Sequence, residues 1–494
     1  MSAKTYPTHD TGNAQRMADN HGHLFRWVTD WQTFIRWDGQ RWERLPDQTA
    51  IEGIAKLSAL DIADEARATT DDDTRRALMK WSASSLDMPR IRACVNAVKS
   101  VEKVRIASTR LDTAPHLLNT TSGTVDLRTG VMHDHAQEDL LTQLVPLAFR
   151  PELMPGSGAP LVAHAERVAP NFTALVRRAF AVDTTDETLA FMLMTFGYAA
   201  IGDNPEQVFF ILYGDTNTGK SQTLECVALV LGRDMADATL SPDLVSKTRN
   251  GAHTEDVNKL AGRRFGAIDE VSDDIDLNEQ EVKRLTGQRE KSVRAIYGRA
   301  HTVPRTWTVF LALNSMPNVE KWDAAIARRV ISVQSGPTVP EKERRPGLAT
   351  SIAQSEGEAI LALIVAGGMA YYGMAESGLV YSKSRLPGHV ARSTRHIEET
   401  TDHIRRFYDE WLEVGEGYET RKDHLLASYT SFREYKSGTH GSHALTTRLE
   451  EIARSQGHGF VDRNGSNRKM LGVQLRAASR SDQDDLTPGQ MMHS

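Results

Sequence analysis

Three runs of β-prone apolar residues in the middle of the chain set its expected fold class. Residues 208–213 (Val-Phe-Phe-Ile-Leu-Tyr), 264–270 and 307–313 each predict a strand, and the first is apolar throughout. A continuously apolar strand is typical of a parallel sheet, because helices cover such a sheet on both faces. We therefore predict an α/β domain built around these strands.

Helical periodicity surrounds the predicted strands. Residues 174–200 become increasingly apolar at helical spacing, and residues 222–231 form a mostly apolar run that stops at Gly232. Glycine is common just after a helix, so Gly232 is expected to end this one. The most apolar run, 361–372, holds two glycines and is too short to span a bilayer, which predicts a buried helix.

The first third of the chain predicts a mixed α+β region. Residues 24–43 contain four of the eight tryptophans, and Asp38-Gly39 between two aromatic runs predicts a two-residue hairpin turn. Residues 123–130 indicate a second hairpin, and residues 50–105 alternate apolar and charged positions at helical spacing. A tryptophan-lined nucleic-acid face is one interpretation of the first hairpin. A small β core filled with aromatic side chains is the simpler one.

These patterns divide the chain into seven expected parts. They are a disordered tail (1–20), an α+β domain (21–150), a helical linker (151–202), an α/β domain with a parallel sheet (203–345), a helical segment (346–400), a C-terminal domain of short helices and a turn-rich basic stretch (401–477), and a disordered tail (478–494). The two tails are assigned because they are polar and show no hydrophobic period.

Composition narrows the class of protein without identifying it. The chain has 494 residues, 25% of them charged, and a formal net charge of −6, which fits a globular protein of several domains. An acidic total excludes a uniformly basic coat for nucleic acid but allows a local basic channel. Two distant cysteines, Cys94 and Cys226, indicate neither a zinc cluster nor a disulfide framework, and no apolar signal core is visible. We therefore expect a cytoplasmic protein without membrane contact.

A glycine-rich sequence directly after the first predicted strand carries the strongest chemical signal. It is Gly214-Asp215-Thr216-Asn217-Thr218-Gly219-Lys220-Ser221, followed by Gln222 and the rest of a predicted helix. Spacing and context both match the Walker A motif, in which backbone N–H groups and a helix N-terminus surround phosphates. Lys220 is expected to neutralise the β and γ phosphates of ATP, and Ser221 to bind Mg²⁺.

Further polar groups that hydrolysis requires follow the other two strands. Asp269 and Glu270 end the second strand, where Asp269 can hold the Mg²⁺ shell and Glu270 can polarise the attacking water. Asn314 follows the third strand and can sense the γ phosphate. Arg328 and Arg329 lie on a predicted helix beyond it. They are either surface arginines or the source of an arginine finger for a neighbouring subunit, and the sequence does not choose between the two.

The segment between the second and third strands predicts a helix followed by a basic hairpin. Asn278 with Glu281 predicts a capped helix start, and Gly287 the helix end. Residues 292–296 and 300–303 then predict two short strands around a turn. The basic positions of this hairpin are Lys291, Arg294, Arg299 and His301. They either grip DNA phosphates or form an ordinary solvated surface.

Together, these motifs resemble the superfamily III helicases of small DNA viruses, phages and plasmids. The similarity is strongest to the phage and plasmid primase–helicase branch, which includes the poxvirus primase–helicase. It rests on the close spacing of the phosphate loop, Asp269-Glu270 and Asn314, on Leu285-Thr-Gly287, on Asn314-x-x-Pro317, on residues 11–16, on the tryptophan hairpin and on residues 117–130. Residues 402–476 look like the C-terminal winged helix of that branch.

The resemblance implies an AAA+-like P-loop ATPase that forms a hexameric ring and translocates on single-stranded DNA, usually 3′ to 5′. It also implies that the basic hairpin projects into the central channel. Asp215 stands where many viral relatives have Pro, and Gln222 where the phage branch often has Thr, but neither change removes a catalytic group. Because the α+β domain starts near residue 21, we expect no room for a primase domain, and a separate primase or polymerase becomes a candidate partner.

Three functions stay open at this point. The first is an ATP-driven replicative helicase that acts on single-stranded and forked DNA. The second is an AAA+-like initiator or loader that remodels origin DNA without processive unwinding, and only strand displacement separates it from the first. In the third, the ATP site is structural and the chain recruits a primase. The water-activating Glu270 argues against this last function.

Overall fold

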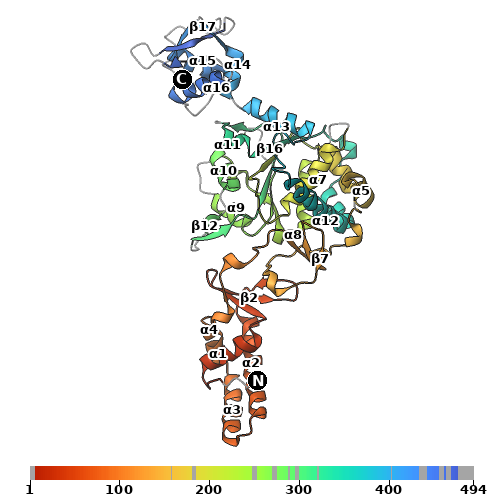
Figure 1. The fold of residues 1–494 in the computed structure, drawn as a ribbon, viewed down its shortest axis with the longest axis vertical. Helices are drawn as coiled ribbons and strands as arrows, with labels where there is room; N and C mark the ends of the chain where they lie inside the picture. The colour runs from red at the N-terminus through yellow and green to blue at the C-terminus, as the bar shows by residue number, and fades with distance from the viewer. Residues whose placement is uncertain are drawn as a thin grey trace.

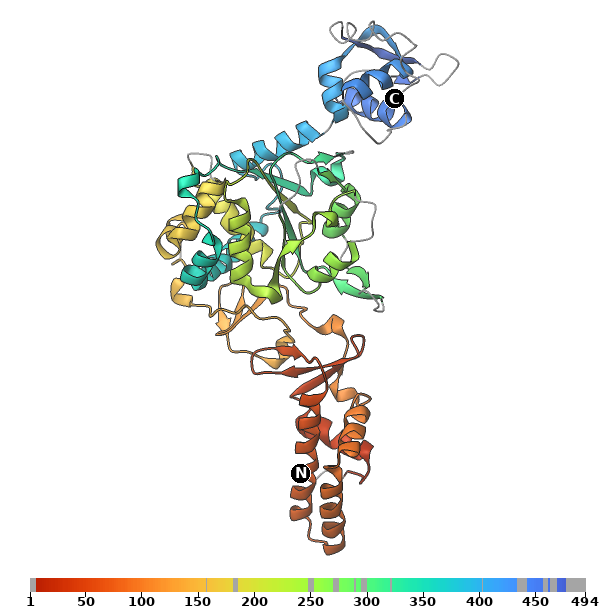
Figure 2. The same ribbon diagram turned by 180° about the vertical axis from the view of Figure 1, so that it is seen from behind.

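The computed structural model describes residues 6–156, 158–180, 185–247, 253–269, 275–287, 290–294, 300–319, 322–401, 403–432, 442–455, 461–462 and 469–476. The molecule is elongated, with a helix-rich N-terminal region at one end, a larger α/β region in the middle and a small C-terminal region at the other end (Figures 1 and 2). The middle region contains most of the predicted functional residues.

The N-terminal region is α+β, as predicted. Its main sheet has the strand order β3-β2-β1-β4, and a second sheet has the order β5-β6-β7. The elements are α1 (Asp10–His21), β1 (Phe25–Val28), β2 (Thr33–Trp37), β3 (Trp42–Arg44), α2 (Thr49–Ala68), α3 (Asp72–Ser85), α4 (Met88–Val98), β4 (Arg105–Ile106), β5 (Leu117–Thr120), β6 (Gly123–Asp126) and β7 (Met132–His133).

The tryptophans of the first hairpin fill the core of this region. Trp27 and Trp42 are buried, and two further tryptophans, Trp31 and Trp37, pack against a buried cluster on one face of the sheet. The hairpin is confirmed, but its loop has four residues rather than two, because Trp37 pairs with Trp42. The Asp38 carboxylate closes this loop by accepting two backbone N–H groups at 2.8 Å. The structure therefore supports the aromatic-core interpretation.

The predicted disordered tail is wrong for residues 10–20, which form most of α1. Met17 of this helix lies in the core, and Arg16 is fully buried, where its guanidinium makes hydrogen bonds of 2.6 and 3.0 Å to the carboxylate of Glu65. Asn13 is also buried and donates to Ser85 Oγ at 3.0 Å. The helix has no clear apolar stripe because polar residues, each satisfied by a partner from another helix, occupy much of its buried face.

A five-stranded, wholly parallel sheet forms the centre of the middle region, which confirms the predicted α/β architecture. The strand order is β16-β8-β14-β10-β9, so β14 lies between β8 and β10. The elements are α5 (Leu161–Val168), α6 (Pro170–Phe180), α7 (Glu187–Ala199), β8 (Phe209–Tyr213), α8 (Lys220–Met235), β9 (Ala236–Leu240), α9 (His253–Leu260), β10 (Phe265–Ile268), β11 (Asp276–Leu277), α10 (Glu279–Gly287), β12 (Glu290–Arg294), β13 (Ala300–Pro304), β14 (Thr308–Leu313), β15 (Asn318–Val319), α11 (Ala324–Ala327), β16 (Val330–Gln334) and α12 (Leu348–Ala375).

Alternate residues of the central strands enter two separate cores. In β8, Phe210 faces the cluster made with α6, α7, α8 and α12, whereas Phe209 faces the cluster made with α9 and α10. On the first face, the rings of Phe210, Phe310 and Phe265 stack across three neighbouring strands, with centroids 5.0 Å apart at each step. Burial on both faces explains why the strand sequences are apolar at nearly every position.

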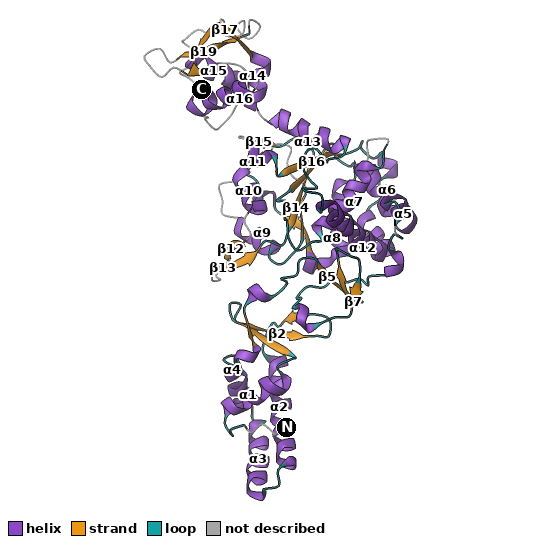
Figure 3. Ribbon diagram, viewed as in Figure 1, coloured by secondary structure: helices purple, strands orange, loops and turns teal. Residues whose placement is uncertain are grey.

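Helix α12 supports one face of the sheet and contains the apolar run that predicted a buried helix. It packs against α7 and α8 (Figure 3). Among the described residues, it is the one helix long and apolar enough to cross a membrane, but 61% of its most apolar window is buried inside the protein. At its crossing with α7, Gly197 lies directly against the backbone of Gly367 and Gly368.

The C-terminal region follows α13 (Gly388–Thr401). It consists of α14 (His403–Trp411), β17 (Leu412–Arg421), α15 (Lys422–Phe432), α16 (Ser442–Ser455), β18 (Val461–Asp462) and β19 (Lys469–Leu475). The three strands form an antiparallel sheet with the order β17-β19-β18, and the helices pack with it around a core of their own.

A methyl group at Gly197 is expected to disrupt the crossing of α7 and α12. A Cβ there would lie 2.1 Å from the Gly368 nitrogen, a backbone atom that can move only with its helix. Gly197→Ala should therefore lower the free energy of unfolding by about 1–3 kcal/mol in chemical denaturation. A Cβ at Gly373, on the exposed side of α12, would meet no atom within 4 Å, so Gly373→Ala should be neutral or stabilising by up to about 1 kcal/mol. Equal effects of the two changes would contradict close packing at the crossing.

Candidate functional site

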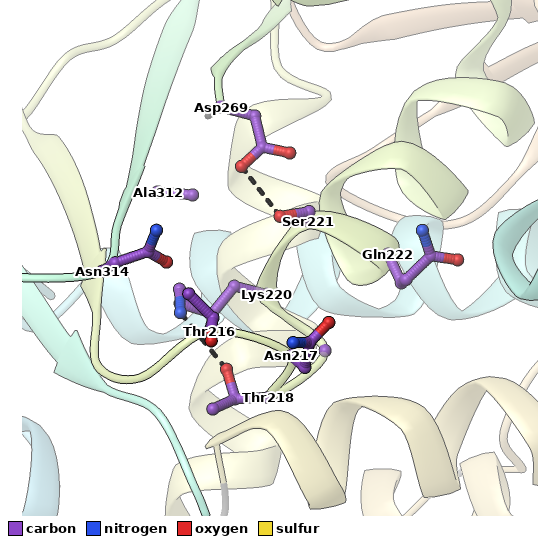
Figure 4. Close-up of a pocket in the computed structure, with 10 residues that line it drawn as sticks. Thr216, Asn217, Thr218, Lys220, Ser221, Gln222, Asp269, Ala312 and Asn314 are labelled. Carbon is purple, nitrogen blue, oxygen red and sulfur yellow. Dashed lines mark hydrogen bonds between the residues drawn. The ribbon is translucent and has the colours of Figure 1, made fainter. Parts of the chain in front are cut away.

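The predicted polar residues lie at one edge of the parallel sheet. β8 leads into the glycine-rich loop 214–219, β10 into Asp269, and β14 into Asn314. Together with the first turn of α8, these segments line a cavity of about 240 Å³ (Figure 4). Because β14 pairs with both β8 and β10, Asn314 reaches the same cavity as the loop and Asp269. The predicted residues that line it are Thr216, Asn217, Thr218, Gly219, Lys220, Ser221, Gln222, Asp269 and Asn314, while Gly214 and Asp215 form the start of the loop.

Two glycines allow the loop to adopt its path. Gly214 has a φ of 138°, and a Cβ there would lie 2.2 Å from the hydroxyl of Ser335. Gly219 has a φ of 102° and comes directly before α8. Such angles strain any residue with a side chain, so glycine is required at both places. The helix begins at the cavity, where its first N–H groups and the positive end of its dipole favour an anion.

Lys220 is 4% exposed, and its ammonium group donates to the loop itself. Nζ lies 2.7 Å from Gly214 O, 2.6 Å from Asp215 O and 3.3 Å from Thr218 Oγ1. Burial lowers the pKa of Lys220, whereas the nearby carboxylates, of which Asp269 is the stronger, act in the opposite direction. A phosphate in the cavity would offer this ammonium charged acceptors, which bind it more strongly than neutral carbonyl groups.

Ser221 and Asp269 meet across the cavity. Ser221 Oγ donates to Asp269 Oδ1 at 2.8 Å (Figure 4). A hydroxyl and a carboxylate fit Mg²⁺, which is typically held by few protein ligands together with water and substrate phosphates. Among the described residues, no group of three or more His, Cys, Asp or Glu side chains could hold a metal alone. The pair therefore fits an ion that binds together with a phosphate ligand. Glu270 lies outside the described residues, and its role stays a prediction.

The predicted basic hairpin is present as two antiparallel strands. β12 and β13 pair from Glu290 with Pro304 to Arg294 with Ala300. They lie at the periphery of the middle region (Figure 3). Of the predicted DNA-contacting residues, Lys291 and Arg294 are on β12 and His301 is on β13, whereas Arg299 lies outside the described residues.

The two candidate finger arginines have different environments. The predicted helix is short, so Arg328 stands at the C-cap of α11 and Arg329 follows it. Arg329 is 7% exposed and donates to Thr286 Oγ1 at 3.1 Å, Ala325 O at 2.7 Å and Gln207 Oε1 at 2.9 Å. Burial, and then the charge of Arg328, lower the pKa of Arg329. Arg328 is exposed and approaches Gln207 Oε1 at 3.3 Å. Arg329 is therefore held within its own chain, and Arg328 is the more accessible.

A second cavity of about 760 Å³ adjoins the first. Four residues line both cavities, which makes them continuous: Asn217, Thr218, Gly219 and Gln222. The outer walls come from α6, from residues 339–346 and from the start of α12, and they include the apolar side chains of Leu175, Leu348 and Ile352. Sequence reasoning missed these walls because they come from separate segments that carry no motif.

Gln222, in the first turn of α8, connects the glycine-rich loop region to the wall of the second cavity. Its Oε1 accepts the backbone N–H of Ala349 in the first turn of α12 at 3.1 Å, and its Nε2 donates to Glu225 at 3.2 Å. The segment that leads to α12 also contacts the loop, because Val339 N–H donates to Asn217 O at 2.8 Å. The wall of the second cavity is therefore fixed both to the loop and to the first turn of α8.

Comparison with known proteins gives a match to the N-terminal part of this architecture. Residues 14–181 match a family model described as "D5 N terminal like". A protein of Frog virus 3 (isolate Goorha), named "Putative helicase 022R", is 21% identical over 433 residues, which cover 67% of this chain and 44% of that protein. The chain thus spans less than half the length of this relative.

Solved structures of the NrS-1 C terminal region are also similar. The A form apo structure of residues 305–718 has a TM-score of 0.35 at 13% identity, and the apo structure of the same residues has a TM-score of 0.35 at 12% identity. Each comparison covers 70% of this chain and 88% of that one.

Changing each of the two adjacent arginines to alanine should have different effects on the free energy of unfolding. Arg329→Ala removes three hydrogen bonds and leaves buried acceptors unpaired, so we expect it to lower the free energy of unfolding by about 2–4 kcal/mol. Arg328→Ala, the matched control, should change it by about 0.5 kcal/mol or less, because its side chain is exposed. Chemical denaturation measures both. A larger loss for Arg328→Ala would contradict the environments described above.

Proposed function

The chain is a member of the D5-like primase–helicase family, and from that premise we propose that it is an ATP-dependent DNA helicase that acts as a ring on single-stranded DNA. One observation carries the proposal. An ammonium group, a hydroxyl and a carboxylate, from Lys220, Ser221 and Asp269, converge on one cavity at the start of a helix. This is the set of groups that ATP and Mg²⁺ require at a phosphate loop.

The protein groups around the cavity have separate tasks in hydrolysis. Lys220 turns from the loop carbonyls to the phosphate oxygens. Ser221 and Asp269 would hold Mg²⁺, and the ion would supply positive charge to the transferred phosphoryl group. Glu270, the next residue in the chain, takes the proton of the attacking water, and Asn314 orients that water. The water oxygen bonds to the γ phosphorus as the phosphorus–oxygen bond to ADP breaks, and ADP and phosphate leave. The second cavity would accept the base and ribose, with apolar contacts from Leu175, Leu348 and Ile352 among walls that also carry charged side chains.

We propose that an arginine from another subunit completes the site. Among the described residues that line the phosphate cavity, Lys220 supplies the one positive charge. Stabilisation of the transition state in such enzymes commonly uses an arginine finger, which a neighbour can supply. We assign this role to Arg328, because it is exposed while Arg329 is held by three hydrogen bonds. A finger in trans implies a homo-oligomer, and we propose a hexameric ring with the basic hairpins in its channel.

The order of elements in the C-terminal region supports the proposal that the chain contacts DNA. Its described elements follow the order helix, strand, helix, helix, strand, strand, which is the order of a winged helix. This observation suits a helicase and also an initiator that binds origin DNA without unwinding it. The initiator is therefore the second candidate function.

Strand displacement distinguishes the two functions. On a forked DNA duplex with ATP and Mg²⁺, we expect the wild-type chain to release the displaced strand and to require a 3′ tail. Lys220→Ala should show no displacement and should bind ATP more weakly, because the phosphates lose their ammonium partner. Glu270→Gln should keep ATP binding and lose turnover.

Other outcomes of the same experiments would favour the second candidate function or contradict the proposed ATP site. ATP turnover that DNA stimulates without displacement would favour the initiator. Equal ATP affinity of Lys220→Ala and the wild type would contradict the phosphate-loop assignment.

A mixing experiment tests the shared site. Arg328→Ala and Glu270→Gln subunits are each expected to hydrolyse ATP about 10³-fold more slowly than wild type when alone. In mixed rings, an intact Glu270 can face an intact Arg328 of its neighbour, so turnover should partly recover. Mixtures of Lys220→Ala with Glu270→Gln subunits are the control, since Lys220 and Glu270 serve the same site and lie in one subunit. No recovery with Arg328→Ala would contradict the assignment of this arginine.

A further inference from the structure

We propose that Thr286 is the centre of a polar junction that couples the candidate finger to the basic hairpin. The junction consists of Asp203, Gln207, Thr286, Arg305 and Arg329. The proposal rests on the proposed function, because it concerns how the ATP site and the DNA-contacting element of that function communicate. Its starting point is that helix α10 ends between these two elements.

The hairpin follows α10 in the chain, and the residue after its second strand contacts the carboxyl end of that helix. This helix ends at Gly287, and β12 begins at Glu290. The returning strand β13 ends at Pro304, and the next residue is Arg305. We call the start of β12 and the end of β13 the feet of the hairpin. Contacts between the last turn of α10 and the residues after β13 therefore fix both feet.

Side chains after β13 close the end of α10. Arg305 Nη1 donates to Thr286 O, and Trp307 Nε1 donates to Leu285 O at 3.2 Å. The last carbonyl groups of a helix have no partner within it, and a positive charge suits the negative end of the helix dipole. Arg305 is 7% exposed, and its Nη2 donates to Asp203 Oδ1 at 2.8 Å. The hairpin feet are therefore tied to one turn of α10 and to the loop before β8.

The same turn is held from the other side by Arg329. Its Nε donates to Thr286 Oγ1 at 3.1 Å. A Cβ at Gly287 would lie 3.1 Å from Nη2 of Arg329, so glycine leaves room for the guanidinium against the helix end. Thr286 thus accepts one hydrogen bond through its side chain from the finger side and another through its main chain from the hairpin side. The physical role of the Leu285-Thr-Gly287 stretch is therefore to receive Arg329 on one side and Arg305 on the other.

Gln207 connects this junction to the exposed Arg328. Its Oε1 accepts from Arg329 at 2.9 Å and from Arg328 at 3.3 Å. Gln207 has a φ of 58°, an angle that residues other than glycine rarely adopt and that the surrounding structure must impose. When Arg328 turns toward a neighbour's phosphate, it gives up the shared acceptor. The balance of hydrogen bonds on Arg329, and through it on Thr286, then changes.

The test is a change that removes one acceptor and keeps the shape. Thr286→Val deletes Oγ1, to which Arg329 donates, and leaves the ATP cavity untouched. Thr173→Val is the matched control, because both threonines are at most 2% exposed and donate to a carbonyl four residues earlier in their helix at 2.7 Å. ATP turnover of the full chain is measured with and without a single-stranded oligothymidine, together with strand displacement on forked DNA.

We expect Thr286→Val to keep basal turnover and the KM for ATP within about twofold of wild type, and to lose about fivefold or more of the stimulation by DNA. Displacement should fall in parallel. Arg305→Lys should show the same loss, because one ammonium group cannot replace the guanidinium fork that spans Thr286 O and Asp203. Thr173→Val should keep full stimulation.

Each contrary outcome has a separate meaning. Full stimulation in both Thr286→Val and Arg305→Lys would overturn the junction and leave the proposed function intact. An equal loss in Thr173→Val would overturn it too, because the effect would not depend on Arg329. A wild-type chain that hydrolyses ATP without stimulation by DNA would also overturn it, since no coupling would exist. A wild-type chain without ATP turnover would instead contradict the proposed function.

Discussion

Parallel pairing of β14 between β8 and β10 is the constraint on which the site depends. Leu313 pairs with Tyr213 and Ile268 with Leu311, so the next residues, Asn314, Gly214 and Asp269, emerge at the same edge of the sheet. A shift of one residue in either register would turn the side chains of the shifted strand to the opposite face and would exchange its apolar residues between the two cores. Burial of apolar residues on both faces prevents that shift, so the packing of the sheet fixes the position of the chemistry.

The elements that the sequence predicted correctly are those whose local pattern and tertiary surroundings agree. The central strands are apolar because both faces are buried, and the loop 214–219 needs glycines at Gly214 and Gly219 for its backbone. Helix α1 was missed because its buried Arg16 finds its partner on α2, a contact that no local pattern encodes. The loop after Trp37 is longer than predicted because the Asp38 carboxylate stabilises a wider turn.

Two adjacent arginines illustrate a difference that the sequence alone could not predict. Arg328 and Arg329 are chemically identical and differ only in what surrounds them. Gln207 and Thr286, which contact Arg329, are about 120 and 40 residues away in the chain and come from different elements. Gln222 is a related case, because it stands where the phage branch often has Thr. The structure gives this glutamine a role, since its side-chain oxygen accepts the backbone N–H of Ala349 at the start of α12. In each case the information lies in the packing of distant segments.

Strand β10 also links the site to the N-terminal region, at the end opposite Asp269. Arg264, just before this strand, is buried and donates to Leu117 O at 2.7 Å, Ala200 O at 2.9 Å and Pro115 O at 3.2 Å. Burial lowers the pKa of Arg264 to about 10, and Asp112 opposes this shift, so the guanidinium stays charged at neutral pH. A buried charge with three carbonyl acceptors is costly to release, because it would leave those acceptors unpaired. One strand therefore leads into Asp269, the proposed metal ligand, at one end and carries the attachment of the N-terminal region at the other. A displacement of β10 must act on both.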